Sequence, residues 1–217
     1  MKKTNAPIKN TELTAVLNTH FRGEIHLARV KLISYFIIAL CKVQTVSFEK
    51  LANGFDSKAT SDSSLRRIQR FIADYSLSSD LIARLVFSLL PNKGKLTLSI
   101  DRTNWKFGQI DINIFMLGIA YNGVAFPLMF SMLNKRGNSN SQERIELRNR
   151  FNRVIGKEVS DCIVAGREFV KGKGLAFLNV NNIRYYIRIR NNIKVIVPHK
   201  NKEVKAAHLF NRFQVNR

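Results

Sequence analysis

The chain has 217 residues, and 36 Lys and Arg side chains against 15 Asp and Glu give it a formal net charge of +21. A hydrophobic fraction of 45% is enough to bury a core, which excludes an intrinsically disordered protein. The longest apolar run, residues 32–41, is about half as long as the ~20 residues that span a bilayer, and no apolar signal segment follows Lys2 and Lys3. We therefore expect a cytoplasmic protein without a membrane-spanning segment.

The basic residues are spread along both halves of the chain, so the charge does not belong to a single tail. Such a surface attracts polyanions, because Lys and Arg side chains neutralise phosphates and release their counterions. Nucleic acid is therefore the favoured partner, and a solvated basic surface without a partner is the alternative. Cys41 and Cys162 are far apart and form no CxxC pair, which argues against a zinc ribbon or a disulfide framework.

Residues 10–90 show helical periodicity, with apolar side chains at intervals of three and four residues. We expect Asp62 or Ser63 to cap one of these helices. A further helix is predicted to begin after Ser79 and to end at the break formed by residues 91–94, which read Pro-Asn-Lys-Gly. The helix that starts near Asp62 carries three arginines: Arg66, Arg67 and Arg70.

Beyond this break the pattern changes to that of strands. The dipeptide Asn122-Gly123 between two apolar runs predicts a β-hairpin. Ser141 is expected to cap a helix that buries Phe151 and keeps Arg144 and Arg148 on its solvent sides. The order β-β-β-α-β-α-β predicts an α+β or α/β fold, in which a helical region precedes a mixed sheet. The predicted strands are residues 96–101, 112–121, 124–133, 161–165 and 184–190, and a second helix is predicted at 175–180.

Asp101 ends the first predicted strand, in the string SIDRTNW. A carboxylate at a strand end beside basic residues is suited to a divalent cation, since Mg²⁺ prefers carboxylate oxygens. The alternative is that Asp101 caps the turn into Arg102 and Thr103. The histidines show no metal-binding spacing, so the sequence does not favour a zinc site.

Five strings of the sequence occur in a specific order: SIDRTNWKFG, NIFMLGIAYNGVAFPL, KRGN, AGREFV and YYIRIR. Together they resemble the DDE transposases of bacterial insertion sequences, in the group with a Tyr-Arg-Glu-Lys motif, over residues 96–195. The resemblance implies a ribonuclease H-like catalytic domain that follows a helical DNA-binding N-terminus. It therefore implies a helical DNA-binding region at residues 1–92 and a partial catalytic domain at residues 93–217.

In this family two Asp and one Glu hold two Mg²⁺ ions, which activate the nucleophile and stabilise the leaving oxygen of a phosphoryl displacement. The resemblance makes Asp101 the first carboxylate and a metal ligand. Gly166 stands where the family has its second Asp, because the chain reads GREF instead of DREF. The third carboxylate is absent, since the chain stops at Arg217 and Glu203 lacks the motif. We therefore expect a C-terminally truncated copy whose two-ion site is not fully formed.

Of the two acidic residues near Gly166, only Glu168 is placed to replace the missing carboxylate. Glu168 lies two residues after Gly166 and shares its face if the strand continues. Asp161 lies five residues before Gly166, so strand alternation points it to the opposite face.

The resemblance implies DNA contacts in the loop after Asp101, in the KRGN loop, beside the second-carboxylate position and on the arginine-bearing helix. Trp105 either stacks on a displaced base or anchors the core. The helix arginines either grip a transposon end or form a solvated face. The predicted DNA-binding residues are Arg66, Arg67, Arg70, Arg102, Asn104, Trp105, Lys106, Arg136 and Arg167.

Two hypotheses about function follow, and the sequence leaves open whether the chain is an enzyme. One is a DNA transposase that acts by metal-dependent strand cleavage and transfer, here as a truncated copy inactive on its own. The other is a non-catalytic DNA-binding remnant that occupies transposon ends. Both predict double-stranded DNA at transposon ends as a partner, with a homodimer or an association with a full-length transposase. Truncation also predicts a sheet face without its helix, and hence exposed apolar surface and marginal stability.

Overall fold

The computed structural model describes residues 9–91, 94–170, 173–197 and 201–210. The contacts within the chain divide it into two compact units, and the division falls between Leu81 and Ile82, inside helix α5 (Ser79–Ser88). The domain boundary that the sequence predicts at residues 92–93 lies outside the described residues. No helix of the described part is long and apolar enough to cross a membrane.

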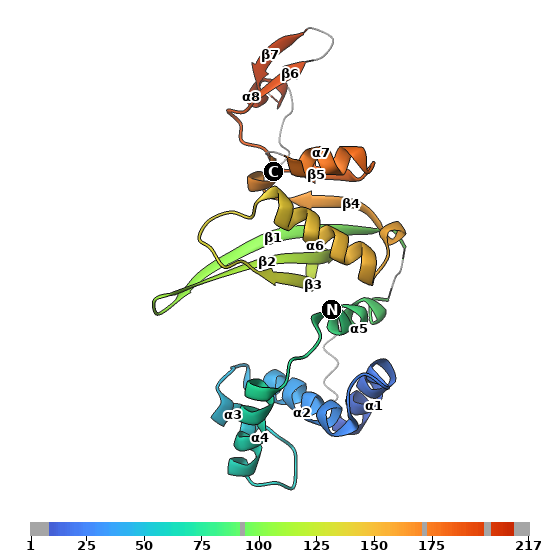
Figure 1. The fold of residues 1–217 in the computed structure, drawn as a ribbon, viewed down its shortest axis with the longest axis vertical. Coiled ribbons are helices and arrows are strands. Elements are labelled where there is room, and N and C mark those ends of the chain that lie inside the picture. The colour runs from blue at the N-terminus through green and yellow to red at the C-terminus, as the bar shows by residue number, and fades with distance from the viewer. Residues whose placement is uncertain (1–8, 92–93, 171–172, 198–200, 211–217) are drawn as a thin grey trace. The chain divides into compact units, whose positions relative to one another are not determined.

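The first unit, called the helical unit below, contains helices α1 to α4 in its described part. Their bounds are α1 (Asn10–Phe21), α2 (Leu27–Val43), α3 (Phe48–Asn53) and α4 (Ser61–Asp74) (Figure 1). Leu32 and Ala39 of α2 pack with Leu51 of α3 and Ile68 of α4 in one buried cluster. The helical periodicity of this region therefore does produce a small helical core.

The caps of α4 and α5 differ in how well the sequence predicts them. Thr60, and not Asp62 or Ser63, caps α4: its hydroxyl accepts a hydrogen bond from the Ser63 N–H at 3.3 Å. Thr60 is the last extended residue before the helix, and only an extended residue can turn its side chain back onto the first free N–H groups. The helix expected after Ser78-Ser79 is present as α5, with the Ser78 hydroxyl 3.3 Å from the Leu81 nitrogen.

The second unit, called the sheet unit below, is built on a five-stranded mixed sheet in the order β3-β2-β1-β4-β5. Strands β1, β2 and β3 pair antiparallel, and β4 and β5 continue the sheet parallel to β1. Helix α6 (Ser141–Val154) connects β3 to β4, and α7 (Lys173–Val180) connects β4 to β5. The predicted α+β class and the order β-β-β-α-β-α-β are thus confirmed. The strands are β1 (Leu96–Phe107), β2 (Ile110–Tyr121), β3 (Val124–Met132), β4 (Ser160–Ala165) and β5 (Arg184–Ile187).

The β2–β3 hairpin turns at Asn122-Gly123, as predicted. Both residues have positive φ, 49° and 77°, which only a dipeptide of this kind adopts without strain. Further along the same pair of strands, the backbones approach so closely that a Cβ on Gly118 would lie 2.8 Å from the Phe126 carbonyl oxygen. The close approach of the two backbones therefore requires glycine at position 118, because any side chain there would clash.

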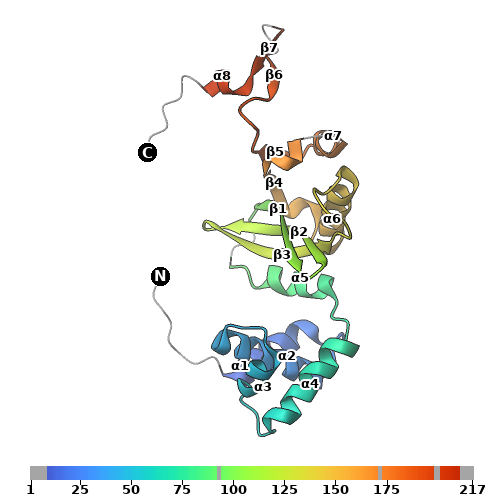
Figure 2. The same ribbon diagram turned by 90° about the vertical axis from the view of Figure 1, so that its left-hand side faces the viewer.

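The two faces of the sheet are covered differently. Helices α6 and α7 lie on one face (Figures 1 and 2), where Leu98 and Ile100 of β1 are buried with Phe151 of α6. Alternation along β1 points Asp101 and Trp105 to the other face, on which the sheet unit places no described helix. That open face exposes Trp105, Phe130, Met132 and Tyr186, in agreement with the expected uncovered apolar surface.

The chain continues past the main sheet into a small second sheet. Strands β6 (Lys194–Val197) and β7 (Lys202–Lys205) pair antiparallel and are followed by α8 (Ala206–Phe210). The sequence analysis does not predict these strands, because each is four residues long and carries charges next to its apolar residues.

Three boundaries in the sheet unit correct the sequence predictions. Strand β1 does not end at Asp101 but continues to Phe107, because every residue from Asp101 onward pairs with β2. The predicted strand 184–190 ends at Ile187. Asn140, and not Ser141, caps α6, since its side chain and that of Glu143 bond to each other's backbone N–H groups.

Candidate functional site

Asp101 and Gly166 lie beside each other where the parallel part of the sheet ends. The pairing between β1 and β4 runs to Ile100 and Ala165, so Asp101 and Gly166 are the next residues on their two segments. The Arg188 N–H donates to the Ala165 carbonyl oxygen at 3.1 Å, which brings the segment after β5 to the same level. Asp101, Gly166 and Arg188 therefore line one open hollow at the carboxyl ends of the strands.

Among the described residues, Asp101 is the one carboxylate that lines the hollow. Asp101 is exposed, and the carbonyl oxygen of Gly166 accepts the Phe169 N–H at 3.1 Å within the turn Arg167–Val170. Among the described residues no group of three or more His, Cys, Asp and Glu side chains is placed to hold a metal ion. The donor set therefore does not fit a two-ion magnesium site, which needs several carboxylate oxygens.

Glu168 is not a substitute for the missing carboxylate. The prediction that it shares the face of Gly166 is wrong, because β4 ends at Ala165 and Glu168 lies in a 3-10 turn. Its Oε2 is 3.4 Å from Nη2 of Arg102, a residue that alternation places on the side of β1 opposite to Asp101. Glu168 therefore serves an internal ion pair.

Asp161 and Glu203 are equally unsuited. Asp161 lies near the start of β4 and is paired with Arg184 of β5, whose guanidinium holds the pKa of the Asp161 carboxyl below its usual value. Glu203 lies in the small β6–β7 sheet, with its Oε2 2.9 Å from the Lys194 Nζ. Both carboxylates are thus engaged by a basic partner away from the open hollow.

Arg102 connects β1 to the KRGN loop. Its Nη2 donates to the Asn138 Oδ1 at 3.0 Å, and its Nη1 is 3.5 Å from the Oδ1 of the buried Asn113. Asn113 in turn donates from its Nδ2 to the Lys135 and Gly137 carbonyl oxygens at 2.8 and 3.0 Å. Arg102 was predicted to lie in a loop after the metal position; the structure instead makes it a half-buried residue within β1.

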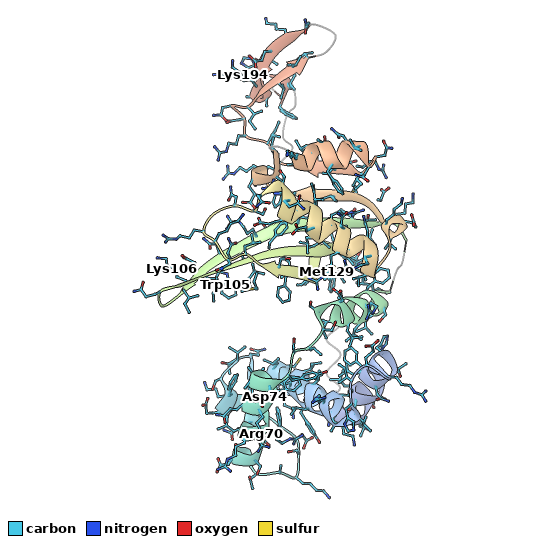
Figure 3. The ribbon with its side chains drawn as sticks, viewed as in Figure 1. Arg70, Asp74, Trp105, Lys106, Met129 and Lys194 are labelled. Carbon is cyan, nitrogen blue, oxygen red and sulfur yellow. The ribbon has the colours of Figure 1, made fainter. Side chains whose placement is uncertain are left out.

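The other predicted DNA contacts of this unit are exposed. Asn104, Trp105 and Lys106 lie in β1 and not in a loop. Trp105 and Lys106 lie toward the end of the β1–β2 hairpin (Figure 3). Trp105 is 54% exposed, so it is not a core anchor. Arg136 is paired through its Nε with the Asp111 Oδ2 at 3.0 Å, and Arg167 is exposed in the turn after Gly166.

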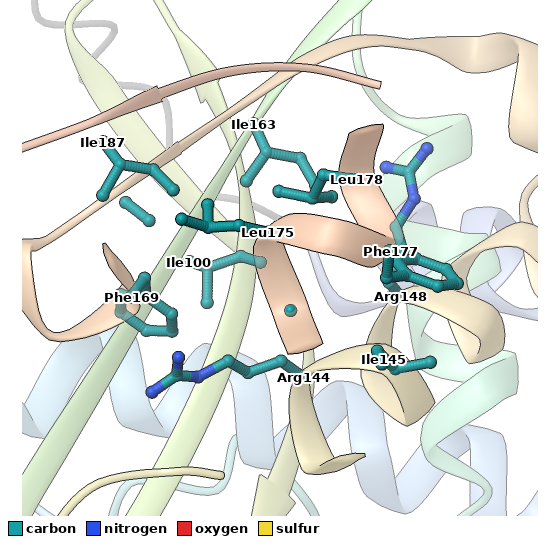
Figure 4. Close-up of a pocket in the computed structure, with 12 residues that line it drawn as sticks. Ile100, Arg144, Ile145, Arg148, Ile163, Phe169, Leu175, Phe177, Leu178 and Ile187 are labelled. Atoms are coloured by element: carbon teal, nitrogen blue, oxygen red, sulfur yellow. The ribbon is translucent and has the colours of Figure 1, made fainter. Parts of the chain in front are cut away.

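A narrow cavity lies between the sheet and helices α6 and α7, and not at Asp101 (Figure 4). Arg144 and Arg148 of α6 border it, although the sequence places both on the solvent sides of the helix. The Arg144 guanidinium lies 4.5 Å from the Phe169 ring centre and donates to the Ser139 Oγ and carbonyl oxygen at 3.0 and 2.6 Å. The remaining lining is apolar, as a gap in core packing would be. It includes Ile100, Ile163, Leu175, Phe177, Leu178 and Ile187.

Arg148 is a buried cation, 3% exposed, with one hydrogen bond from its Nη2 to the Ser160 Oγ at 2.6 Å. Its Nε and Nη1 have no partner among the described residues. Burial lowers the pKa of Arg148 to about 10. Sequence patterns miss this residue because arginine on a helix is normally solvated.

In the helical unit, the three predicted arginines do not share one surface. Arg67 and Arg70 border a hollow between α2 and α4, together with Arg29, which the sequence analysis did not single out. Arg66 is exposed and does not line this hollow. No local signal marks Arg29, because the hollow joins helices that are distant along the chain.

No protein-family model matches the sequence, and no curated protein matches it. Among solved structures, the HTLV-2 integrase catalytic core domain in complex with magnesium is 15% identical with a TM-score of 0.35, covering 45% of this chain and 62% of that chain. The simian T-cell lymphotropic virus intasome is 17% identical with a TM-score of 0.36, covering 66% of this chain and 52% of that one. The large terminase of a thermophilic bacteriophage is 20% identical with a TM-score of 0.31, covering 46% and 24%.

The chain thus spans less than two thirds of the length of each of these structures. At these identities and TM-scores we take the fold from the strand order and pairing of the chain itself. The meander β1–β2–β3 followed by two parallel strands is the arrangement that the ribonuclease H-like resemblance implies.

Proposed function

We propose that this chain is a transposase-type DNA-binding protein, related to the DDE transposases of bacterial insertion sequences, that does not cut DNA on its own. The observation that carries the proposal is the adjacency of Asp101 and Gly166 at the point where the parallel pairing of β1 with β4 ends. The two positions that the resemblance pairs as metal-binding are far apart in sequence, yet they share one open hollow.

The lack of carboxylate ligands at the hollow supports the part of the proposal that says the chain does not cut DNA on its own. An in-line displacement at phosphorus needs cations held by several carboxylates, and Asp101 is the only carboxylate that lines the hollow in the described part of the chain. Glu168 and Asp161 are held by Arg102 and Arg184. The chain then occupies DNA without activating a nucleophile, which favours the remnant hypothesis over an independent enzyme.

The exposed groups around the hollow support DNA as the ligand. Arg188 is exposed in the lining of the hollow, and Arg167 is exposed directly after Gly166, where both can donate to phosphate oxygens. Trp105 and Lys106 supply an aromatic face and a cation further along β1. Transposon ends, a helical DNA-binding region at residues 1–92, and a homodimer or pairing with a full-length transposase complete the proposal.

Two assays on the purified full chain test this function. Fluorescence anisotropy with labelled duplex DNA is expected to show binding, and incubation of plasmid and transposon-end DNA with Mg²⁺ or Mn²⁺ is expected to show no nicking. Nicking that Asp101→Ala abolishes would establish an active enzyme instead. Failure to bind duplex DNA at low salt would overturn the proposal as a whole.

The Gly166→Asp variant tests more directly whether missing carboxylates explain the expected lack of DNA cleavage. A Cβ on Gly166 has no atom within 4 Å, so the side chain of an aspartate can branch from this position without a clash at its Cβ. We expect no nicking activity from this variant, because the described residues supply no third carboxylate to the hollow. Recovery of activity from this one change would show that two carboxylates suffice here.

A further inference from the structure

The hollow between α2 and α4 gathers arginines from two helices. Arg67 and Arg70 share a helix face with Phe71 and Asp74, since the four residues are spaced at i, i+3, i+4 and i+7. Arg29 reaches the same hollow from the first turns of α2. We call these residues, with Tyr75, the α2–α4 hollow.

The positive charge of the α2–α4 hollow is not neutralised within the described residues. Neither Arg67 nor Arg70 makes an ion pair or hydrogen bond there, and the recorded contact of Arg29 is with the Tyr75 ring. Asp74 is the one carboxylate in the lining, against three guanidinium groups. Unpaired guanidinium groups that converge on one concave surface are a binding site for anions with several oxygens.

The aromatic side chains hold Arg29 in place. Its guanidinium carbon lies 4.4 Å from the centre of the Tyr75 ring, and Tyr75 packs on Phe71 with ring centres 5.1 Å apart. Phe71 is anchored on Phe36 of α2 at 5.8 Å. This aromatic chain ties the end of α4 to α2, so that Arg29 faces the same side as Arg67 and Arg70.

We propose that the α2–α4 hollow binds backbone phosphates of duplex DNA, as a second contact surface separate from the hollow at Asp101. This inference takes duplex DNA as the ligand from the proposed function. It adds which residues contact the phosphates and which residue, Asp74, repels them. Arg67 and Arg70 donate directly, Tyr75 positions Arg29, and Asp74 weakens binding by its negative charge. Arg66 precedes Arg67 on α4 but does not line the hollow, so it does not contribute to this binding.

The matched comparison is between arginines of one helix. We expect Arg67→Gln and Arg70→Gln each to weaken duplex binding by roughly tenfold in anisotropy titrations of the full chain, with a salt dependence shallower by about one contact. Arg66→Gln removes the same charge from α4 and is expected to stay within about twofold of the unmodified chain. Equal losses in all three variants would mean that only the total charge matters, and would overturn the proposal.

Two further variants test the opposing and positioning roles. Asp74→Asn is expected to tighten binding several-fold, and to have no effect in a chain that also carries Arg67→Gln and Arg70→Gln. Tyr75→Phe keeps the ring under Arg29 and is expected to bind like the unmodified chain, whereas Tyr75→Leu weakens binding. Circular dichroism of each variant checks that the helices are retained. A loss in Tyr75→Phe equal to that in Tyr75→Leu would contradict the role of the ring.

These measurements distinguish a failure of the proposed function from a failure of this inference alone. If the unmodified chain does not bind duplex DNA, the proposed function fails. If it binds and the hollow variants bind equally well, only this inference fails. Inorganic phosphate, titrated against chloride at matched ionic strength, is expected to compete weakly. If phosphate binds tightly and the variants lose phosphate but not DNA, the hollow takes a small anion and the DNA assignment is overturned.

Discussion

Two glycines of the sheet unit differ in what surrounds them, which makes them a matched pair for a stability test. Gly118→Ala places a Cβ 2.8 Å from the Phe126 carbonyl oxygen, so β2 and β3 must separate. We expect the free energy of unfolding to fall by about 2 kcal/mol in urea denaturation. Gly166→Ala meets no atom within 4 Å and is expected to change stability by less than about 0.5 kcal/mol. A large effect at Gly166 would show that its surroundings are more crowded than described.

Arg148 carries a buried charge that no carboxylate among the described residues pairs; its guanidinium lies 5.2 Å from the Phe151 ring centre. Burial lowers its pKa to about 10, so the folded state disfavours the charged form. The penalty is fully present at neutral pH and decreases as pH rises through about 10, because the folded protein then releases the proton before the unfolded chain does. Arg148→Met is expected to raise the free energy of unfolding by roughly 1–3 kcal/mol at neutral pH.

Arg144→Met is the control for this change. The Arg144 guanidinium donates to Ser139 and to the Glu168 carbonyl oxygen and stacks on Phe169, so its loss is expected to lower the free energy of unfolding by roughly 2 kcal/mol. Urea denaturation of both variants checks the opposite signs. Destabilisation by Arg148→Met would mean that its bond to Ser160 outweighs the burial of the charge.

At the scale of elements, α6 begins with a reciprocal cap that fixes the end of the KRGN loop. The Asn140 Oδ1 accepts the Glu143 N–H at 2.9 Å, and the Glu143 carboxylate accepts the Asn140 N–H at 2.7 Å. Asn140→Ala is expected to lower the free energy of unfolding by about 1 kcal/mol. Ser141→Ala, at the position that the sequence favours, is expected to have no measurable effect in the same denaturation experiment. The reverse order would contradict the observed cap.

The same elements show what the sequence can predict. The β2–β3 hairpin was predictable, because the turn needs two residues with positive φ and the adjacent pair Asn122-Gly123 adopts this conformation readily. The continuation of β1 beyond Asp101 was not, since it depends on pairing with β2 and its alternate residues are charged or polar. Arg144 and Arg148 border a cavity that residues of α7 also line, and the periodicity of α6 alone cannot predict this tertiary contact.

The candidate site was partly predictable for the same reason. Asp101 was singled out from its strand, but its adjacency to Gly166 required the family resemblance, since parallel pairing joins distant segments. The ion pair that removes Glu168 from the site, and the place of Arg29 beside Arg67 and Arg70, depend on tertiary contacts. No pattern along the chain encodes these contacts.

At the scale of the whole molecule, a net charge of +21 predicts how DNA binding responds to salt. Each phosphate that the protein neutralises releases a counterion, so the logarithm of affinity falls linearly with the logarithm of salt concentration. For about six phosphate contacts the affinity is expected to fall on the order of a thousandfold between about 50 and about 200 mM salt. Anisotropy titrations over this range check the slope. A shallow slope would mean that the charge is not directed at phosphates.

Helix α5 has a consequence for any rearrangement of this chain. Its part from Ala83 onward, together with Leu90, packs against the core of the sheet unit, although the clearest break in the sequence comes only after it. A graft that joined the sheet to a foreign recognition module at that break would remove these side chains and open the hydrophobic interior to water. Exchange of the helical unit between proteins is therefore tolerated only at a junction upstream of Ser79.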